Sequence, residues 1–209
     1  DKTTIFLTCQ NGIPEMSLSK YVPADRIMGS AISWGGFYKG PGCSELANTP
    51  ENMQVTLGTY TGEHTPELDE VNEILSKAEH VSIADNLMGL RWSKLTVNAT
   101  FSSVSTLTGY NFGQVLDDRG LMKLVTFLGR DCVKACEGSG IKMDPVHHTL
   151  GVFDLTKVYD FEDADIDAAV QKAIDAAEGY VRPGGATVAS MFQDIKRGLK
   201  TEVDYIPGA

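Results

Sequence analysis

The sequence DNLMGLRWSKLTVNATFSSVSTLT, residues 85–108, marks the point at which the character of this chain changes. Its apolar side chains recur every three or four residues, which predicts one long amphipathic helix. The positions that form the apolar face are Leu87, Leu90, the stem of Lys94, Leu95, Val97, Phe101 and Val104. From this helix onward the pattern is almost entirely helical, whereas the residues before it alternate between strand and helix patterns.

Three further helices are expected after residue 108. The first covers residues 114–137 and stops at Gly138-Ser139-Gly140, because glycine is favoured just beyond a helix end. The second covers residues 166–180 and is broken by Pro183-Gly184-Gly185. The third runs from residue 187 to about residue 200.

Short runs of β-branched and apolar residues dominate the first part of the chain. They predict strands over residues 3–9, 26–33 and 53–57, with a short helix over residues 14–21. The glycine-rich run at 35–42 indicates a hairpin-like connection. A helix is predicted over residues 66–75, because Thr65 is a suitable N-cap and Pro66 suits the first helical position.

These patterns predict two domains, since a mixed α/β layer and an all-helical layer each need their own core. We place the first at residues 1–86 and the second at residues 87–209. The expected fold class is therefore α/β plus all-α. The first domain is small for a parallel doubly wound sheet, so its start is expected to be missing.

Composition limits the class of partner. The chain has 209 residues, of which 42% are hydrophobic and 22% charged, and a formal net charge of −10. This balance argues against nucleic acid, which requires a surplus of Lys and Arg, but allows an anionic small substrate beside a local cation. No apolar run approaches the ~20 residues that span a bilayer, and no signal peptide is visible. We therefore expect neither nucleic acid nor a membrane as the partner.

The four cysteines, Cys9, Cys43, Cys132 and Cys136, lack the CxxC spacing of redox and zinc motifs. They are expected to be buried, reduced thiols in a cytoplasmic protein. His147-His148 has no carboxylate or thiol at metal-ligand spacing, so no metal site is predicted. The GxGxxG fingerprint of dinucleotide-binding loops is also missing from the sequence.

Lys94 and Asn98 are four residues apart in the predicted helix, so both project from one face. A lysine on a partly buried face has a lowered pKa and becomes a competent proton donor near neutral pH. The ordinary alternative is a surface lysine whose stem covers apolar area. By the same reasoning Glu202 could be a solvated carboxylate, and Ser190 could simply begin a helix.

Two stretches together resemble the active-site signatures of the ketopantoate reductase (2-dehydropantoate 2-reductase) family. Trp92-Ser93-Lys94-Leu95-Thr96-Val97-Asn98-Ala99 is similar to the motif W-x-K-L-x-x-N. Ser190-Met191-Phe192-Gln193-Asp194-Ile195 and Thr201-Glu202-Val203-Asp204-Tyr205-Ile206 resemble S-M-x-Q-D-I and T-E-I-D-Y-I. Gln10-Asn11-Gly12 looks like the family's Q-N-G turn. The resemblance runs through the whole chain in the right order.

The resemblance implies reduction of 2-dehydropantoate to pantoate by NADPH in pantothenate biosynthesis, or reduction of a related 2-oxo acid. It implies these roles: Lys94 as general acid, Asn98 holding the substrate, Ser190 on its carboxylate, Glu202 on its hydroxyl, and Asn11 at the nicotinamide end of NADPH. The fold it implies is the C-terminal part of a Rossmann-like domain, followed by a helical domain like that of 6-phosphogluconate dehydrogenase.

Some positions depart from the family pattern. Ser102 stands where some members carry a second asparagine, Phe112 where some carry asparagine, and Pro207 replaces the asparagine of Y-I-N-G. The substrate is therefore less constrained than the reaction class. We expect the N-terminal Gly-rich part and closing helices to be missing, and the 209 residues alone to be inactive. The alternative is a non-enzymatic helical dimerisation or binding module, and a homodimer is compatible with either hypothesis.

Overall fold

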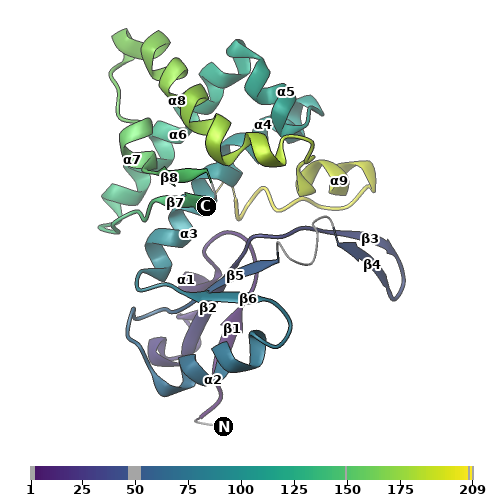
Figure 1. Cartoon of the computed structure of the whole chain (residues 1–209), viewed down its shortest axis with the longest axis vertical. Coiled ribbons are helices and arrows are strands. Elements are labelled where there is room, and N and C mark those ends of the chain that lie inside the picture. The colour runs from purple at the N-terminus through teal and green to yellow at the C-terminus, as the bar shows by residue number, and fades with distance from the viewer. Residues whose placement is uncertain (1–2, 47–52, 149, 207, 209) are drawn as a thin grey trace. The chain divides into compact units, whose positions relative to one another are not determined.

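The computed structural model describes residues 3–46, 53–148, 150–206 and 208 (Figure 1). The chain divides into two compact units, Asp1–Leu87 and Met88–Ala209. The first unit contains a sheet with helices, and the second is mainly helical. Pro207, one of the positions that depart from the family pattern, lies outside the described residues.

A four-stranded mixed sheet organises the first unit. Its order is β1-β2-β5-β6, in which β1 pairs with β2 and β5 with β6 in parallel, and β2 with β5 antiparallel. The strands are β1 (Phe6–Thr8), β2 (Ile27–Ile32), β5 (Gln54–Thr59) and β6 (His80–Ile83). Helix α1 (Pro14–Leu18) and a 3₁₀ turn (Ala24–Arg26) connect β1 to β2. The predicted strands and the short helix are confirmed, whereas β6 was not predicted.

The two faces of this sheet are covered in different ways. Neighbouring residues of a strand point to opposite faces, so Met28 and Gly29 of β2 do too. Met28 packs with Leu57 and Leu68, the last on α2 (Pro66–Leu75). On the other face Gly29 lies against the Glu15 carboxylate and the Leu87 side chain. The absence of a side chain at this position therefore lets α1 and the residues after β6 approach the strand closely.

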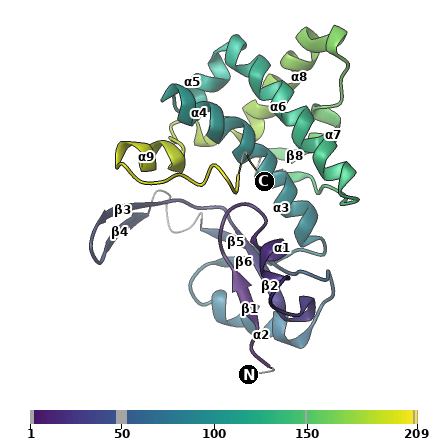
Figure 2. The ribbon, with the colours of Figure 1, turned by 180° about the vertical axis from the view of Figure 1, so that it is seen from behind.

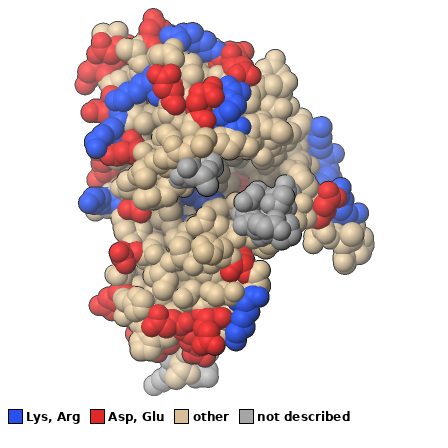
Figure 3. Space-filling view, in the orientation of Figure 1, with Lys and Arg blue, Asp and Glu red and all other residues tan. Residues whose placement is uncertain are grey.

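The predicted start of α2 is confirmed by its cap. Thr65 has an extended backbone, and its hydroxyl accepts a hydrogen bond from the Leu68 amide. Pro66 occupies the first helical turn, where its missing N–H costs nothing. Figure 3 shows acidic side chains gathered over this end of the unit, where α2 carries Glu67 and Asp69 in its first turn.

The glycine-rich run expected as a hairpin-like connection forms the first strand and the turn of a β-hairpin. Residues Gly36–Gly40 make β3, which pairs antiparallel with β4 (Cys43–Leu46). Gly42 has a φ of 73°, a left-handed conformation that favours glycine in the turn between them. The turn is therefore confined to two residues, Pro41 and Gly42, and the flanking residues extend the hairpin.

Helices dominate the second unit (Figure 2). Helix α3 (Leu87–Val97) leads through a π-helical turn (Asn98–Ser102) into α4 (Ser103–Thr108). The later elements are α5 (Phe112–Asp117), α6 (Arg119–Gly138), β7 (Val146–His148), β8 (Gly151–Phe153), α7 (Leu155–Val158), α8 (Ile166–Tyr180), a 3₁₀ turn (Arg182–Gly184) and α9 (Ser190–Lys196).

Three of the helix predictions need correction in detail. The long helix at 85–108 is continuous, but its π turn was not predicted. The helix expected at 114–137 is interrupted at Asp118, whose extended backbone and capping side chain begin α6 anew. The last helix is shorter than expected, because Gly198 adopts a left-handed φ of 69° just beyond it.

Tyr159 is one of the largest side chains that are fully buried in the helical unit. Helix α6 packs against α8, and the views of the ribbon place the two side by side. Gly129 of α6 lies so close to the Tyr159 ring that an added Cβ would be 2.6 Å from its atoms. The Tyr159 hydroxyl lies 3.3 Å from that of Tyr180 on α8, and burial raises the pKa of both phenols. The small residue in α6 thus makes room for the tyrosine that fills the core.

All four cysteines are free thiols, but the expectation that all are buried is wrong for Cys9 and Cys43, which are exposed. Cys136 is buried and Cys132 half-buried. Among the helices in the described part of the chain, none is both long and apolar enough to cross a membrane.

Candidate active site

Lys94 lies on α3, a helix in which most residues are buried or half-buried. Its neighbours Ser93 and Leu95 are buried, and Lys94 itself is half-buried. Burial and, to a smaller extent, the positive charge of Arg91 together lower the pKa of the Lys94 ammonium from 10.5 to about 8. An amine with this pKa can exchange a proton near neutral pH, as a general acid must.

Arg91 was not singled out from the sequence. It is only 1% exposed, which is rare for a charged side chain. It lies three residues before Lys94, so the two cations share one side of α3. The signal that could have revealed it is this (i, i+3) spacing, because like charges one turn apart depress each other's pKa.

Hydroxyl side chains hold α3 in place. Ser93 Oγ donates to the Asp144 carbonyl, on the segment before β7. Thr96 Oγ1 donates to the Trp92 carbonyl at 2.9 Å. Both side chains are buried, so the helix carries polar groups inside the unit that are satisfied by backbone carbonyls.

Asn98 begins the π turn, one turn after Lys94. Both side chains are half-buried, and the four-residue spacing places them on one face, as predicted. The Asn98 carbonyl accepts from the Ser103 amide, five residues on, which is the hydrogen bond of a π helix. Ser102, where some relatives carry a second asparagine, is 8% exposed and its carbonyl accepts from Thr106 Oγ1.

Ser190 is the first residue of α9, and its side chain is exposed. The preceding residue, Ala189, donates its amide to Ser105 Oγ on α4 at 3.4 Å. Gly109, which ends α4 with a φ of 75°, faces the ring of Phe192 on α9. The start of α9 is therefore attached to the same continuous helix that carries Lys94 and Asn98.

Glu202 lies in a turn after α9. Its carbonyl accepts from the amides of Tyr205 at 2.9 Å and Ile206 at 3.1 Å, and Ile206 is buried. The turn is thus anchored, while the Glu202 side chain is exposed. The convergence of this carboxylate with Lys94 on one substrate stays a prediction.

Asn11 belongs to the first unit and is half-buried. It lies just beyond the carboxyl end of β1, before Gly12 with a φ of 79° and helix α1. A hollow of about 420 Å³ opens beside this turn. It is lined by Phe6, Leu7, Thr8, Gln10, Pro14, Ser17, Leu18 and Tyr21.

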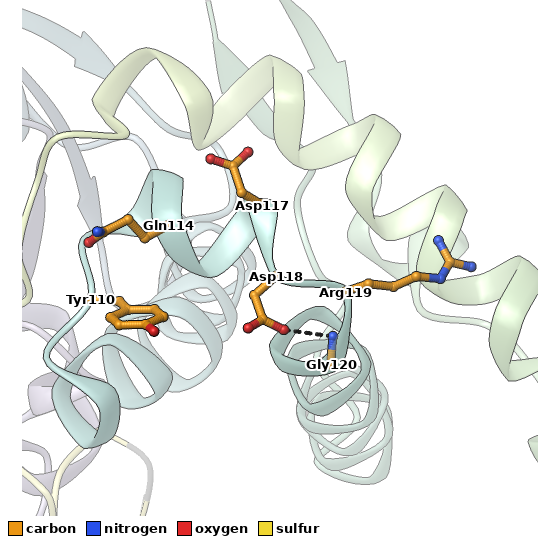
Figure 4. A pocket seen from close by; sticks show the side chains of 6 residues that line it. All are labelled: Tyr110, Gln114, Asp117, Asp118, Arg119 and Gly120. Carbon is orange, nitrogen blue, oxygen red and sulfur yellow. Dashed lines mark hydrogen bonds between the residues drawn. The ribbon is translucent and has the colours of Figure 1, made fainter.

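A second hollow, of about 570 Å³, lies on the helical unit but contains none of the predicted site residues (Figure 4). Its Asp118 caps α6 by accepting from the Gly120 amide at 2.8 Å, and its Asp117 pairs with Arg182 at 2.7 Å. Both carboxylates already have structural partners. Within the described ranges, no cluster of three or more His, Cys, Asp or Glu side chains is suited to a metal ion.

A family model described as the C-terminal part of ketopantoate reductases (PanE/ApbA) matches residues 86–209. The chain belongs to the ketopantoate reductase family. The match covers Lys94, Asn98, Ser190 and Glu202, and it begins after the segment that carries Asn11.

Two of the curated relatives that this chain matches are named 2-dehydropantoate 2-reductases. The protein from Pyrococcus horikoshii is 23% identical over 208 residues, which are 99% of this chain and 59% of that protein. The protein from Mesorhizobium japonicum is 23% identical over 197 residues, or 94% of this chain and 51% of that protein. The chain thus spans little more than half the length of the curated relatives it matches.

Solved structures share the fold. D-mandelate dehydrogenase with NADH has a TM-score of 0.75 at 22% identity, over all of this chain and 62% of that one. The 2-dehydropantoate 2-reductase from Geobacter metallireducens has a TM-score of 0.69 at 21% identity, over 99% and 60%. A dimeric ketopantoate reductase from Staphylococcus aureus has a TM-score of 0.67 at 16% identity, over 100% and 60%. The expected fold class, part of a Rossmann-like domain followed by a helical domain, is confirmed.

Proposed function

We propose that the protein containing this chain reduces a 2-oxo acid, with 2-dehydropantoate as the first candidate, and that NADPH is its cofactor. The observation that carries the proposal is the half-buried Lys94, whose pKa is lowered to about 8, one turn before Asn98 inside the segment that the family model matches. A buried cation is costly for a fold, so its presence favours a chemical role.

The first unit is suited to one end of a dinucleotide. In sheets with parallel βαβ connections, ligands bind beyond the carboxyl ends of the strands. Asn11 lies at that end of β1, in the turn before α1, and a hollow opens next to it. Asn11 would hold the nicotinamide end of the cofactor, which when bound supplies a hydride to the carbonyl carbon of the substrate.

Lys94 supplies the proton in this mechanism. As the carbonyl oxygen gains negative charge, the Lys94 ammonium donates a hydrogen bond to it and then a proton, which leaves a 2-hydroxy acid and a neutral amine. Water returns the proton to the amine. Asn98 would orient the carbonyl, Ser190 would hydrogen-bond the carboxylate, and Glu202 would accept a hydrogen bond from a substrate hydroxyl.

Replacement of Lys94 in the full-length protein tests the proposal. Lys94→Ala is expected to lower kcat about 10²- to 10⁴-fold, because it removes the general acid, with the affinity for NADPH nearly unchanged. The measurement is the loss of NADPH absorbance with 2-dehydropantoate. Lys123→Ala, on the exposed side of α6, is the matched control and is expected to retain activity. Unchanged turnover in Lys94→Ala would remove this residue from the mechanism.

A panel of substrates and cofactors separates the remaining alternatives. The neighbour with NADH is a D-mandelate dehydrogenase, so aryl 2-oxo acids and NADH belong in the same assay as 2-dehydropantoate and NADPH. No reduction of any 2-oxo acid with either cofactor would favour the non-enzymatic helical module. A homodimer is proposed by analogy with the dimeric relative, and light scattering of the full-length protein tests it.

A further inference from the structure

The π turn at Asn98–Ser102 separates two groups of proposed substrate-binding residues. Lys94 and Asn98 lie before or at the turn, on the α3 side. Ser105 lies after it on α4, where its hydroxyl accepts from the Ala189 amide and so attaches the residue before Ser190. The conformation of five residues therefore determines how the two groups face each other.

A π turn is an unusual element, because it inserts one residue into the regular hydrogen-bond ladder of an α-helix. The Asn98 carbonyl accepts from the Ser103 amide, five residues on. In general, such an insertion changes the local hydrogen-bond pattern and rotates the following helix relative to the preceding one. Such a turn persists only where other groups stabilise it.

Thr100, within the turn, hydrogen-bonds two carbonyls that precede the turn. Its hydroxyl lies 2.7 Å from the Thr96 carbonyl and 3.1 Å from the Val97 carbonyl, so that one O–H is shared between the two. Thr100 is fully buried, so water cannot replace this donor. The turn also packs against α6, and its Phe101 is fully buried.

We propose that Thr100 is a positioning residue of the reductase site: its hydroxyl stabilises the π turn, which aligns Lys94 and Asn98 with the Ser190 end of the substrate. The inference rests on the proposed function. Thr100 acts through the backbone and touches neither substrate nor cofactor. Without the hydroxyl the turn relaxes toward an α-helix, and α4 rotates. Ser105 and the start of α9 move with α4, so Ser190 is no longer aligned with Lys94 and Asn98.

Three variants of the full-length protein test this role. Thr100→Val keeps the shape of the side chain and removes the hydroxyl, whereas Thr100→Ser keeps the hydroxyl. Thr126→Val is the matched control, because Thr126 is also fully buried and donates to the carbonyl four residues before it at 2.7 Å, but in the regular helix α6. For each, kcat and KM for the 2-oxo acid are measured together with the thermal unfolding midpoint.

Thr100→Val is expected to lower kcat/KM for the 2-oxo acid by about 10- to 100-fold, the scale of a small misplacement of reacting groups, with KM for the nicotinamide cofactor unchanged. Thr100→Ser is expected to stay within about threefold of the wild type. Thr126→Val is expected to lower the unfolding midpoint as Thr100→Val does but to keep its activity. Equal activity in Thr100→Val and Thr126→Val would overturn the proposal.

Two outcomes have a separate meaning. If Thr100→Val does not fold, the pair Thr100→Ser and Thr100→Ala decides, since these variants differ only in the hydroxyl; equal kcat/KM in both would overturn the positioning role. If the wild-type protein reduces no 2-oxo acid, the proposed function fails, and this result is distinct from an active wild type with an equally active Thr100→Val.

Discussion

The helical unit contains two long helical stretches of opposite character. Helix α6 is regular and amphipathic over its 20 residues, with one buried side and one exposed side. The stretch from α3 through the π turn to α4 is buried over most of its circumference, yet contains Arg91, Lys94 and several hydroxyl side chains. The buried side of α6 is formed by Met122, Val125, Thr126, Gly129, Val133 and Cys136.

This difference separates packing from chemistry. A helix that serves only to pack buries apolar side chains, because burial of polar and charged groups costs free energy. Helix α6 largely follows this rule, and its charged residues are exposed except Arg130, which is half-buried and pairs with Asp163. The α3 stretch violates it at Lys94 and Arg91, and a violation inside a core is expected where a site needs a group with an altered pKa.

The largest expected effect that tests this difference between α6 and the α3 stretch is the change of kcat/KM with pH in the proposed reaction. Because burial lowers the pKa of Lys94 to about 8, the protonated amine needed for reduction is lost above that pH. We expect kcat/KM for reduction to be level below about pH 8 and to fall about tenfold per pH unit above it. The reverse reaction, oxidation of the 2-hydroxy acid, needs the neutral amine. Its kcat/KM should therefore rise with pH up to about pH 8 and be level above it.

The control for this prediction is a lysine of the other helix. Lys123→Met on α6 removes an exposed cation and should leave both profiles in place. Lys94→Arg keeps the positive charge, but the arginine side chain cannot release a proton in this pH range. This variant should lose most of the activity, and its remaining kcat/KM should no longer fall above about pH 8. A wild-type profile that falls only near pH 10.5 would show that Lys94 is not desolvated, and the contrast between the helices would be lost.

The packing helix is tested by its glycine. Gly129→Ala would place a Cβ 2.6 Å from the Tyr159 ring, so the core must shift, at a cost of about 1–3 kcal/mol in the free energy of unfolding. Gly138→Ala, at the end of the same helix, meets nothing within 4 Å and should gain up to about 0.5 kcal/mol. Urea denaturation measures both. A neutral Gly129→Ala would mean that Tyr159 is free to move and that α6 does not depend on this contact.

The regular elements of the fold could be predicted because their signals are local. Thr65 and Pro66 fixed the start of α2, and the periodicity of residues 166–180 matches α8 residue for residue. Strand β6 was missed because residues 80–83 include polar side chains and its pairing with β5 is a long-range contact. The π turn was missed for a related reason, since hydrophobic periodicity reports neither a one-residue insertion nor the contacts of the Thr100 hydroxyl with two carbonyls.

The candidate site was predictable only in part. The spacing of Lys94 and Asn98 gave a shared helix face, but spacing could not show how far Lys94 is buried, which the structure adds together with its lowered pKa. The role of Lys94 as a proton donor stays a prediction. Arg91 was not anticipated, because its burial depends on packing from distant parts of the chain. Ser190 and Glu202 were named from family resemblance alone, and their joint action on one substrate stays a prediction.

The interruption at Asp118 gives the smallest effect and concerns how α6 begins. The Asp118 carboxylate accepts from the amides of Gly120 at 2.8 Å and Leu121 at 3.1 Å, so it caps a new helix where periodicity alone predicts a continuous one. Asp118→Ala should lower the free energy of unfolding by about 1 kcal/mol, because these amides lose their acceptor. Asp117→Ala removes only an exposed ion pair with Arg182 and should cost about 0.5 kcal/mol or less. Urea denaturation of the two variants distinguishes a cap from a surface pair. Equal values would show that the break between α5 and α6 is imposed by the surrounding packing and not by the Asp118 side chain.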